Sequence, residues 1–124
     1  AVPAAPVLLC QKNLEEGGPF HGIVANSGNA NACTGADGLK DAQQMAQRAA
    51  ASLNQKPPAF FVCSTGRIGQ PLPLDRVLKG LERAVTEKGR TPAHGKKAAD
   101  AILTSDTRAK TVTVSFVYDG KKHT

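Results

Sequence analysis

The chain has 124 residues, of which 40% are hydrophobic and 21% are charged, and its formal net charge is +6. This length allows one domain with a real core, and the composition excludes a disordered or membrane-spanning chain. The positive charge favours acidic partners, but the lysines and arginines are spread over predicted helix faces, and one Tyr, four Phe and no Trp are too few aromatic platforms for single-stranded nucleic acid. We therefore expect a solvated surface, with neither a nucleic-acid nor a membrane partner.

The residues that could bind a metal are scattered: Cys10, His21, Cys33, Cys63, His94 and His123. A zinc site requires clustered ligands, such as a C-x-x-C pair, so we expect no metal. An odd number of reduced cysteines and the lack of a signal-type N-terminus indicate a cytoplasmic protein, with a removed targeting segment left open.

The N-terminal quarter is predicted to contain two short strands. Residues 1–6 carry two prolines and are expected to be extended, and the apolar run Val7–Cys10 predicts the first strand. Residues 15–19, EEGGP, predict a turn. Residues 21–25 predict the second strand, which leads into the small-residue segment VANSGNANACTG at 24–35.

A long helix is predicted between this segment and the next strand. It begins at Asp37 or Gly38 and ends at Lys56–Pro58, where two prolines stop it. Its apolar residues recur at helical spacing: Leu39, Ala42, Met45, Ala46, Ala49, Ala50 and Leu53. The apolar run Ala59–Val62 then predicts a strand, and a second small-residue loop, CSTGRIG, follows it at 63–69.

Two more helices and a strand are predicted in the remaining sequence. Leu72–Pro73 opens an amphipathic helix that ends at a glycine, and Thr91–Pro92 opens another that runs to Leu103. The alternating sequence TVTVSFV at 111–117 predicts a half-buried strand, and YDGK at 118–121 predicts a hairpin turn. Few residues follow the turn, so we expect either a trimmed chain or a natural polypeptide that continues.

This order of strands and helices predicts an α/β fold, a layered sandwich of a mixed sheet and helices. Residues 1–124 are expected to form a single but incomplete domain.

The two small-residue loops are candidates for a functional site because each follows an apolar strand and precedes an amphipathic helix. Hydroxyls, asparagine amides and glycine N–H groups are neutral donors, which suit an oxyanion that develops during a reaction. Phosphate binding is a weaker alternative, since only Arg67 supplies a positive charge within the loops. A pair of ordinary turn-rich connections is the third interpretation.

Two further clusters carry competing interpretations. Cys63 stands beside Ser64 and Thr65, but no histidine lies nearby in the sequence to act as its base, so a buried structural thiol is favoured over a nucleophile. In AILTSDT at 101–107, helix capping is favoured over a functional cluster that presents Thr104 or Asp106 to a polar ligand.

Four motifs occur in order and at suitable separations: AAPV at 4–7, NSGNANACTG at 26–35, CSTG at 63–66 and AILTSDT at 101–107. Together they span nearly the whole chain. They resemble the N-terminal part, or alpha chain, of ornithine acetyltransferase, also called glutamate N-acetyltransferase, of arginine biosynthesis.

The resemblance implies a self-cleaving threonine acetyltransferase and aminopeptidase-like fold, here partial. It implies that a companion beta chain begins with the nucleophilic threonine, and that the enzyme moves acetyl from N-acetylornithine to glutamate through an acetyl-threonine intermediate. By the same resemblance, Thr65 and Gly66 form the oxyanion hole and Thr104 binds substrate. No cofactor is implied, acetyl-CoA is a further substrate in some relatives, and an oligomer is expected.

Several positions depart from the family pattern. Arg67 stands where an apolar residue is usual, and Ser105 stands where a second threonine is common. The glycine-rich run and cleavage site that follow in the family are absent from this sequence, as are the strands that precede AAPV, so we expect no acetyl transfer from this chain alone. The alternatives are a segment of a related self-cleaving amidase or aminopeptidase, or a basic, non-catalytic nucleic-acid-binding module.

Overall fold

Two parallel strands form the centre of the computed structural model, which describes residues 2–124. β1 (Gly22–Asn29) pairs with β2 (Phe60–Arg67) over their full lengths. The connection between them contains helix α2 (Gly35–Ser52) and a short 3-10 helix, η1 (Pro57–Ala59). A parallel pair requires such a crossover, because a short hairpin would reverse the chain.

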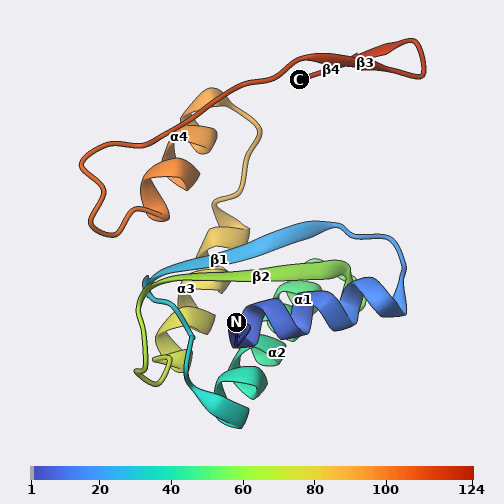
Figure 1. Cartoon of the computed structure of the whole chain (residues 1–124). Coiled ribbons are helices and arrows are strands. Elements are labelled where there is room, and N and C mark those ends of the chain that lie inside the picture. The colour runs from blue at the N-terminus through green and yellow to red at the C-terminus, as the bar shows by residue number, and fades with distance from the viewer. Residues whose placement is uncertain (1) are drawn as a thin grey trace.

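The core lies between this strand pair and α2. Helices α1 (Ala5–Glu16) and α3 (Leu74–Thr86) pack at its sides, and Figure 1 shows α1 and α2 on one side of the two strands. The buried apolar residues form two adjoining clusters: Leu9, Ala42, Met45, Ala46, Val62 and Leu72 in one, and Ala49, Ala50, Ala59, Phe60 and Leu81 in the other. The apolar stripe predicted for the long helix is therefore confirmed.

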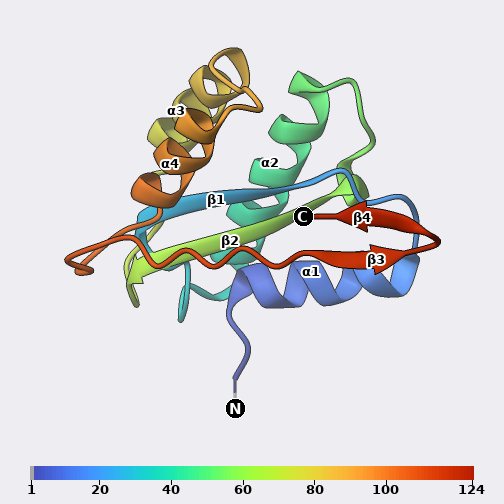
Figure 2. The same cartoon turned by 90° about the horizontal axis from the view of Figure 1, so that it is seen from above.

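The C-terminal part lies on the opposite side of the strand pair, as Figures 1 and 2 show. It consists of α4 (Pro92–Ala101) and a hairpin of β3 (Phe116–Tyr118) and β4 (Lys121–His123). None of the residues in these three elements is buried. The α/β class is confirmed, but the parallel and antiparallel strands of residues 2–124 form two separate sheets and not the mixed sheet that we expected.

The strand predicted at Val7–Cys10 is wrong, because these residues lie in α1. Pro6 stands in the first turn of the helix, where its missing N–H is tolerated. Ala5, Leu9 and Asn13, at four-residue intervals, are the buried face. A run of four apolar residues does not distinguish a helix from a strand, and here the longer helical spacing decides.

Helix α1 also covers the outer edge of β2. The Asn13 Nδ2 donates to the Phe60 carbonyl at 3.2 Å, and the Val62 N–H donates to Cys10 Sγ at 3.4 Å. Side chains of a helix thus satisfy backbone groups that would otherwise form an open sheet edge.

Two predictions about strand length were also wrong. Both central strands continue into the small-residue segments, as far as Asn29 and Arg67, which we had predicted to be loops. Conversely, most of residues 111–117 forms no strand, and Val112 and Val114 are exposed instead of half-buried. The hairpin turn at 118–121 is confirmed.

Two properties of the described residues bear on function. None of the helices found within residues 2–124 has an apolar stretch long enough to cross a lipid bilayer. The same residues contain no group of three or more His, Cys, Asp or Glu side chains arranged to hold a metal ion.

Candidate functional site

The two small-residue segments lie side by side, residue against residue, at the carboxyl ends of β1 and β2. In the strand register, Ser27 is opposite Thr65 and Gly28 is opposite Gly66. The carboxyl edge of a parallel sheet is where ligands bind in many α/β proteins. The sequence placed the two segments at strand ends, and the parallel pairing brings them together.

Glycine is required where the two backbones meet. Gly66 has φ +131, a conformation in which L side chains are strained, and Gly28 has φ +98. A Cβ atom added to Gly66 would lie 2.4 Å from the carbonyl carbon of Gly28. The strands can approach this closely only because Gly66 carries no side chain, whereas a Cβ on Gly28 would meet nothing within 4 Å and glycine is favoured there by its φ alone.

The asparagines of the first segment are structural, which corrects the expectation that their amides are free donors. Asn29 Nδ2 donates to the carbonyls of Gln70 and Pro71 at 3.2 and 3.0 Å, and Asn29 Oδ1 accepts the Asn31 N–H at 3.0 Å. The side chain of Asn29 thereby ties the end of β1 to the chain that follows β2. We call this arrangement the Asn29 clasp.

Asn31 continues the network into the N-terminus of α2. Its side chain is fully buried, donates to the Gly38 carbonyl at 2.8 Å, and accepts the Thr34 hydroxyl at 2.8 Å. Its φ of 46 lies in the left-handed region, which asparagine tolerates better than most residues. Asn26 is engaged as well, because its Oδ1 accepts the Ser64 hydroxyl at 2.6 Å.

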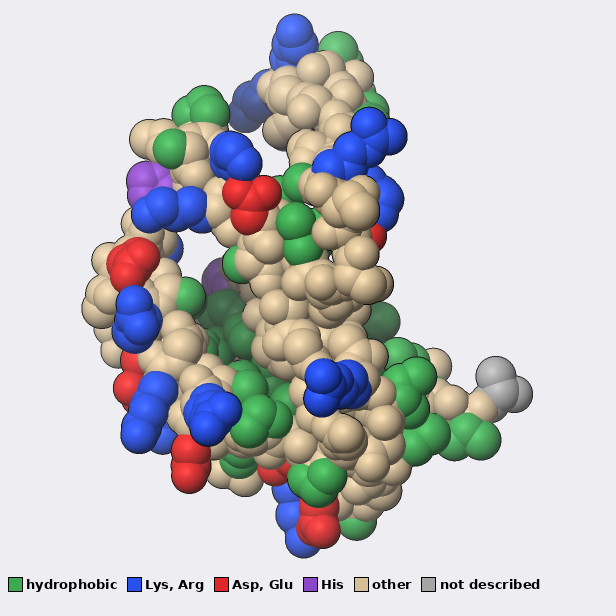
Figure 3. Space-filling model, turned by 90° about the vertical axis from the view of Figure 1, so that its left-hand side faces the viewer, with side chains coloured by type: hydrophobic (Ala, Val, Ile, Leu, Met, Phe, Trp, Pro, Cys, Tyr) green, Lys and Arg blue, Asp and Glu red, His purple; other side chains and the backbone are tan. Residues whose placement is uncertain are grey.

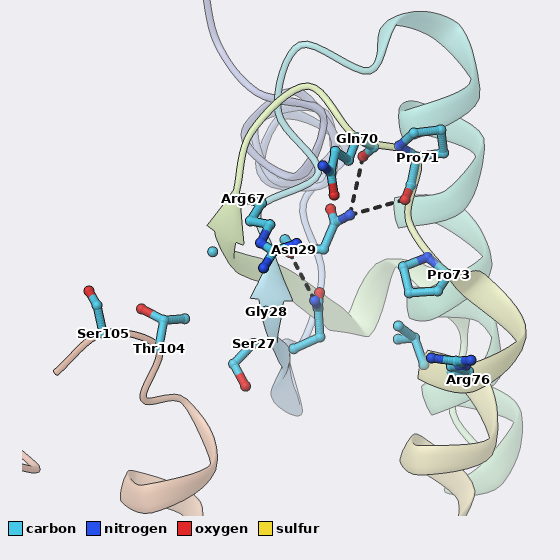
Figure 4. A pocket seen from close by; sticks show the side chains of 13 residues that line it. Ser27, Gly28, Asn29, Arg67, Gln70, Pro71, Pro73, Arg76, Thr104 and Ser105 are labelled. Atoms are coloured by element: carbon cyan, nitrogen blue, oxygen red, sulfur yellow. Dashed lines mark hydrogen bonds between the residues drawn. The ribbon is translucent and has the colours of Figure 1, made fainter.

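An open cavity of about 940 Å³ lies beside the strand ends. Figure 3 shows this side of the molecule, where the surface is hollowed and lysine and arginine side chains are spread around it. The cavity is lined by Asn26, Ser27, Gly28, Asn29, Gly66, Arg67, Gln70, Pro71, Pro73, Arg76, Val77, Thr104 and Ser105. Figure 4 shows Thr104 and Ser105 on one side of the cavity and Arg76 on another.

One hydrogen bond connects the C-terminal end of α4 to this site. The Ser27 hydroxyl donates to the Ala101 carbonyl at 2.7 Å, at the end of α4. Beyond it, a hydrogen bond from Lys110 and the charge of that ammonium group, helped by the Thr104 N–H, lower the pKa of Asp106. Asp106 is therefore engaged by Lys110, four residues along the chain, while Thr104 lines the cavity.

The structure brings together two of the three residues that the sequence singled out. Gly66 and Thr104 line the same cavity although they are far apart in the chain. Thr65 is exposed, directly precedes Gly66, and is not among the residues that line the cavity. The chemical roles of all three residues stay predictions.

Of the two charged lining residues, sequence reasoning considered Arg67 only for the weaker phosphate-binding alternative, and it missed Arg76. Arg67 carried a signal, because an arginine replaces the apolar residue usual after the C-S-T-G motif. Arg76 carried none, because an arginine on an amphipathic helix is ordinarily a surface residue.

The prediction that Cys63 is a buried thiol is wrong. Cys63 is exposed, whereas its neighbour Val62 is buried in the core. Successive strand residues point to opposite faces, and the face of β2 that carries Cys63 is the one away from α2. The three cysteines form no disulfide among themselves.

A model of one protein family, described as the ArgJ family, matches residues 1–124. Among curated proteins, the arginine biosynthesis bifunctional protein ArgJ 1 of Clostridium acetobutylicum is 50% identical over 123 residues, which are 99% of this chain and 29% of that protein. The corresponding protein of Caldanaerobacter subterraneus is 48% identical over 120 residues, 97% of this chain and 29% of its own length. The chain therefore spans about 29% of the curated relatives that it matches.

Two solved structures are similar in fold. One is an ornithine acetyltransferase from Mycobacterium tuberculosis, determined in complex with ornithine, with a TM-score of 0.81 and 40% identity over 86% of this chain and 57% of that one. The other is an arginine biosynthesis bifunctional protein from Bacillus halodurans, with a TM-score of 0.79 and 32% identity over 98% of this chain and 62% of that one.

Proposed function

Because the chain belongs to the ArgJ family, we propose that it is part of an acetyltransferase of arginine biosynthesis that moves acetyl from N-acetylornithine to glutamate. The observation that carries this proposal is the match of that family over residues 1–124. The cavity at the strand ends supports it because Gly66 and Thr104, to which the resemblance assigns the oxyanion hole and substrate binding, both line it.

The proposed reaction proceeds in two steps. A threonine hydroxyl from a companion chain attacks the acetyl carbonyl of N-acetylornithine, its own α-amino group accepting the proton. The tetrahedral oxyanion then collapses, the C–N bond breaks, and ornithine leaves with a proton on its amine. The amine of glutamate attacks the acetyl-threonine ester through a second oxyanion and releases N-acetylglutamate and the free threonine.

Thr65 and Gly66 are proposed to stabilise both oxyanions with a hydroxyl and a backbone N–H. The Arg67 carbonyl accepts the Ala30 N–H at 2.8 Å, so Arg67 directs its backbone groups towards β1. Backbone groups alternate in direction along a strand, and the Gly66 N–H is therefore expected to point away from β1 and to be available. Neutral donors held in place before the charge develops are the most effective form of such stabilisation.

The remaining parts of the proposal concern the rest of the enzyme. The companion beta chain supplies the nucleophile, Thr104 contacts the substrate, and acetyl-CoA is an alternative acetyl donor. We also propose an oligomeric, cytoplasmic enzyme that is cleaved autocatalytically, and we expect no acetyl transfer from residues 1–124 alone.

The test is Thr65→Ala in the complete enzyme, with the companion chain present. We expect kcat to fall roughly a hundredfold with little change in KM, because the lost hydroxyl acts mainly on the transition state. Thr65→Ser, which keeps the hydroxyl, should stay near the wild-type rate, and Thr113→Ala, at an exposed threonine outside the cavity, is the matched control. An unchanged kcat in Thr65→Ala would remove the oxyanion role.

A further inference from the structure

The cavity beside the strand ends carries an uncompensated positive charge. Arg67 and Arg76 are its only charged lining residues among those that the structure describes. Neither arginine takes part in an ion pair within residues 2–124, whereas Arg48 pairs with Glu82 and Arg83 lies 4.0 Å from Glu87. Arg67 and Arg76 differ from the other arginines in that both line the same polar cavity.

The two guanidinium groups reach the cavity from different elements. Arg67 is the last residue of β2, and Arg76 lies in the first turn of α3. Figure 4 shows them on two sides of Asn29 and Pro73. The start of a helix carries a partial positive charge, but Asp75 lies in the same first turn of α3 and offsets it, so the attraction for an anion comes from the two guanidinium groups.

The segment between the two arginines is fixed in place. The Asn29 clasp holds the carbonyls of Gln70 and Pro71, and the Gly69 N–H donates to the Ala32 carbonyl at 2.8 Å. A binding group that is already positioned loses less conformational entropy when a ligand arrives. Both arginines therefore have rigid attachment points on the rim of the cavity.

We propose that Arg67 and Arg76 form an anion subsite that binds a doubly negative part of a ligand, either a phosphate group or a pair of carboxylates. Guanidinium groups bind both kinds of oxyanion through paired N–H donors. This inference rests on the proposed function for the identity of the ligand, because glutamate carries two carboxylates and acetyl-CoA carries phosphates. The presence of the subsite itself depends only on the cavity and its two arginines.

The subsite is tested first by calorimetry on the purified protein, with pyrophosphate and with glutarate as probes. Wild type should bind at least one of these probes, and Arg67→Gln and Arg76→Gln should each weaken that binding roughly tenfold or more, since each removes a charge-assisted contact. Arg83→Gln is the matched control, because Arg83 lies on α3 but does not line the cavity. Circular dichroism shows whether each variant is folded.

Binding that is equal in wild type and both cavity variants, or binding of neither probe by wild type, would overturn the proposal. So would an equal loss in Arg83→Gln, because that result would show a general surface-charge effect. Arg67→Lys adds a second check, since it keeps the charge but loses the paired donors and should bind more weakly than wild type and better than Arg67→Gln.

The complete enzyme then separates the two sources of the anion. A rise in KM for glutamate alone in Arg67→Gln and Arg76→Gln assigns the subsite to carboxylates, and a rise in KM for acetyl-CoA alone assigns it to phosphate. Probe binding that depends on both arginines, in a complete enzyme that shows no acetyl transfer with its companion chain present, would support the subsite while contradicting the proposed function. The two proposals can therefore fail separately.

Discussion

At the scale of single residues, the asparagine side chains explain how the ends of β1 and β2 and the segments that follow them are held in a fixed arrangement. Asn29 and Asn31 use their side chains to satisfy backbone groups that belong to three different segments. A buried polar group without a partner costs free energy comparable to that of a lost hydrogen bond, so each asparagine stabilises the site by what it completes.

We predict that Asn31→Ala lowers the free energy of unfolding by about 2 to 3 kcal/mol, because it removes the buried amide that bonds the Gly38 carbonyl and the Thr34 hydroxyl and keeps a left-handed φ. Asn54→Ala is the control, since Asn54 also has a positive φ, of 53, but is exposed. It should cost only about 1 kcal/mol, for the strained backbone. Urea denaturation measures both, and equal losses would show that the network adds nothing.

At the scale of elements, the close approach of β1 and β2 depends on one glycine. We predict that Gly66→Ala strongly destabilises the protein, because the new methyl group would overlap the backbone of Gly28 and the strands would have to separate. Gly69→Ala is the control: Gly69 also has a positive φ, of +76, but a Cβ there meets nothing within 4 Å.

Thermal unfolding distinguishes the two variants. Gly69→Ala should lose roughly 1 kcal/mol from backbone strain alone, and Gly66→Ala should lose clearly more. If the two variants melt together, the contact between the strands is looser than the distance to Gly28 implies.

The elements differ in how far the sequence predicted them. α2 and α3 were predicted correctly because their apolar stripes extend over several turns. α1 was not, because the apolar run inside it is short. Its helical spacing becomes visible only when Asn13, a polar residue, is counted as part of the buried face. A sequence pattern cannot show that this asparagine is buried in order to bind the Phe60 carbonyl of β2.

The strands were predicted too short for a related reason. Small polar residues have low strand propensity, and the segments after Val24 and Val62 were expected to be loops. In the structure, backbone pairing extends the strands to Asn29 and Arg67 in spite of that propensity. For the same reason, the alternating segment 111–117 forms strand only near Phe116, where β4 is available to pair with it.

The candidate site was predictable in part. The motifs singled out Gly66 and Thr104, which both line the cavity. They also predicted the family, and the match to the ArgJ family confirms it. The motifs did not predict that Arg76 lines the cavity or that the asparagine side chains bind backbone groups. Both depend on which segments meet in the folded chain, and the neighbouring residues in the sequence do not show that.

At the scale of the whole molecule, residues 92–124 are packed less tightly than the rest. No residue of α4 or of the hairpin is buried, whereas α2 and the central strands form the core. A segment with few buried contacts opens locally at a lower free energy than the core does.

We therefore predict that amide hydrogens of α4 exchange much faster than those of α2 when the chain is studied alone. Mass spectrometry of peptic fragments measures the difference, and α2 within the same sample serves as the internal reference. Equal protection of the two helices would contradict the packing described here. Slower exchange of α4 after addition of a companion polypeptide would indicate that the partner covers this side of the molecule.

The Asn29 clasp restricts few of the side chains around it. Asn29 recognises the main-chain oxygens of Gln70 and Pro71, not their side chains, so those two positions can be exchanged without undoing the link. The side chains at positions 70 and 71, which line the cavity, can consequently differ while the backbone arrangement that Asn29 holds stays the same.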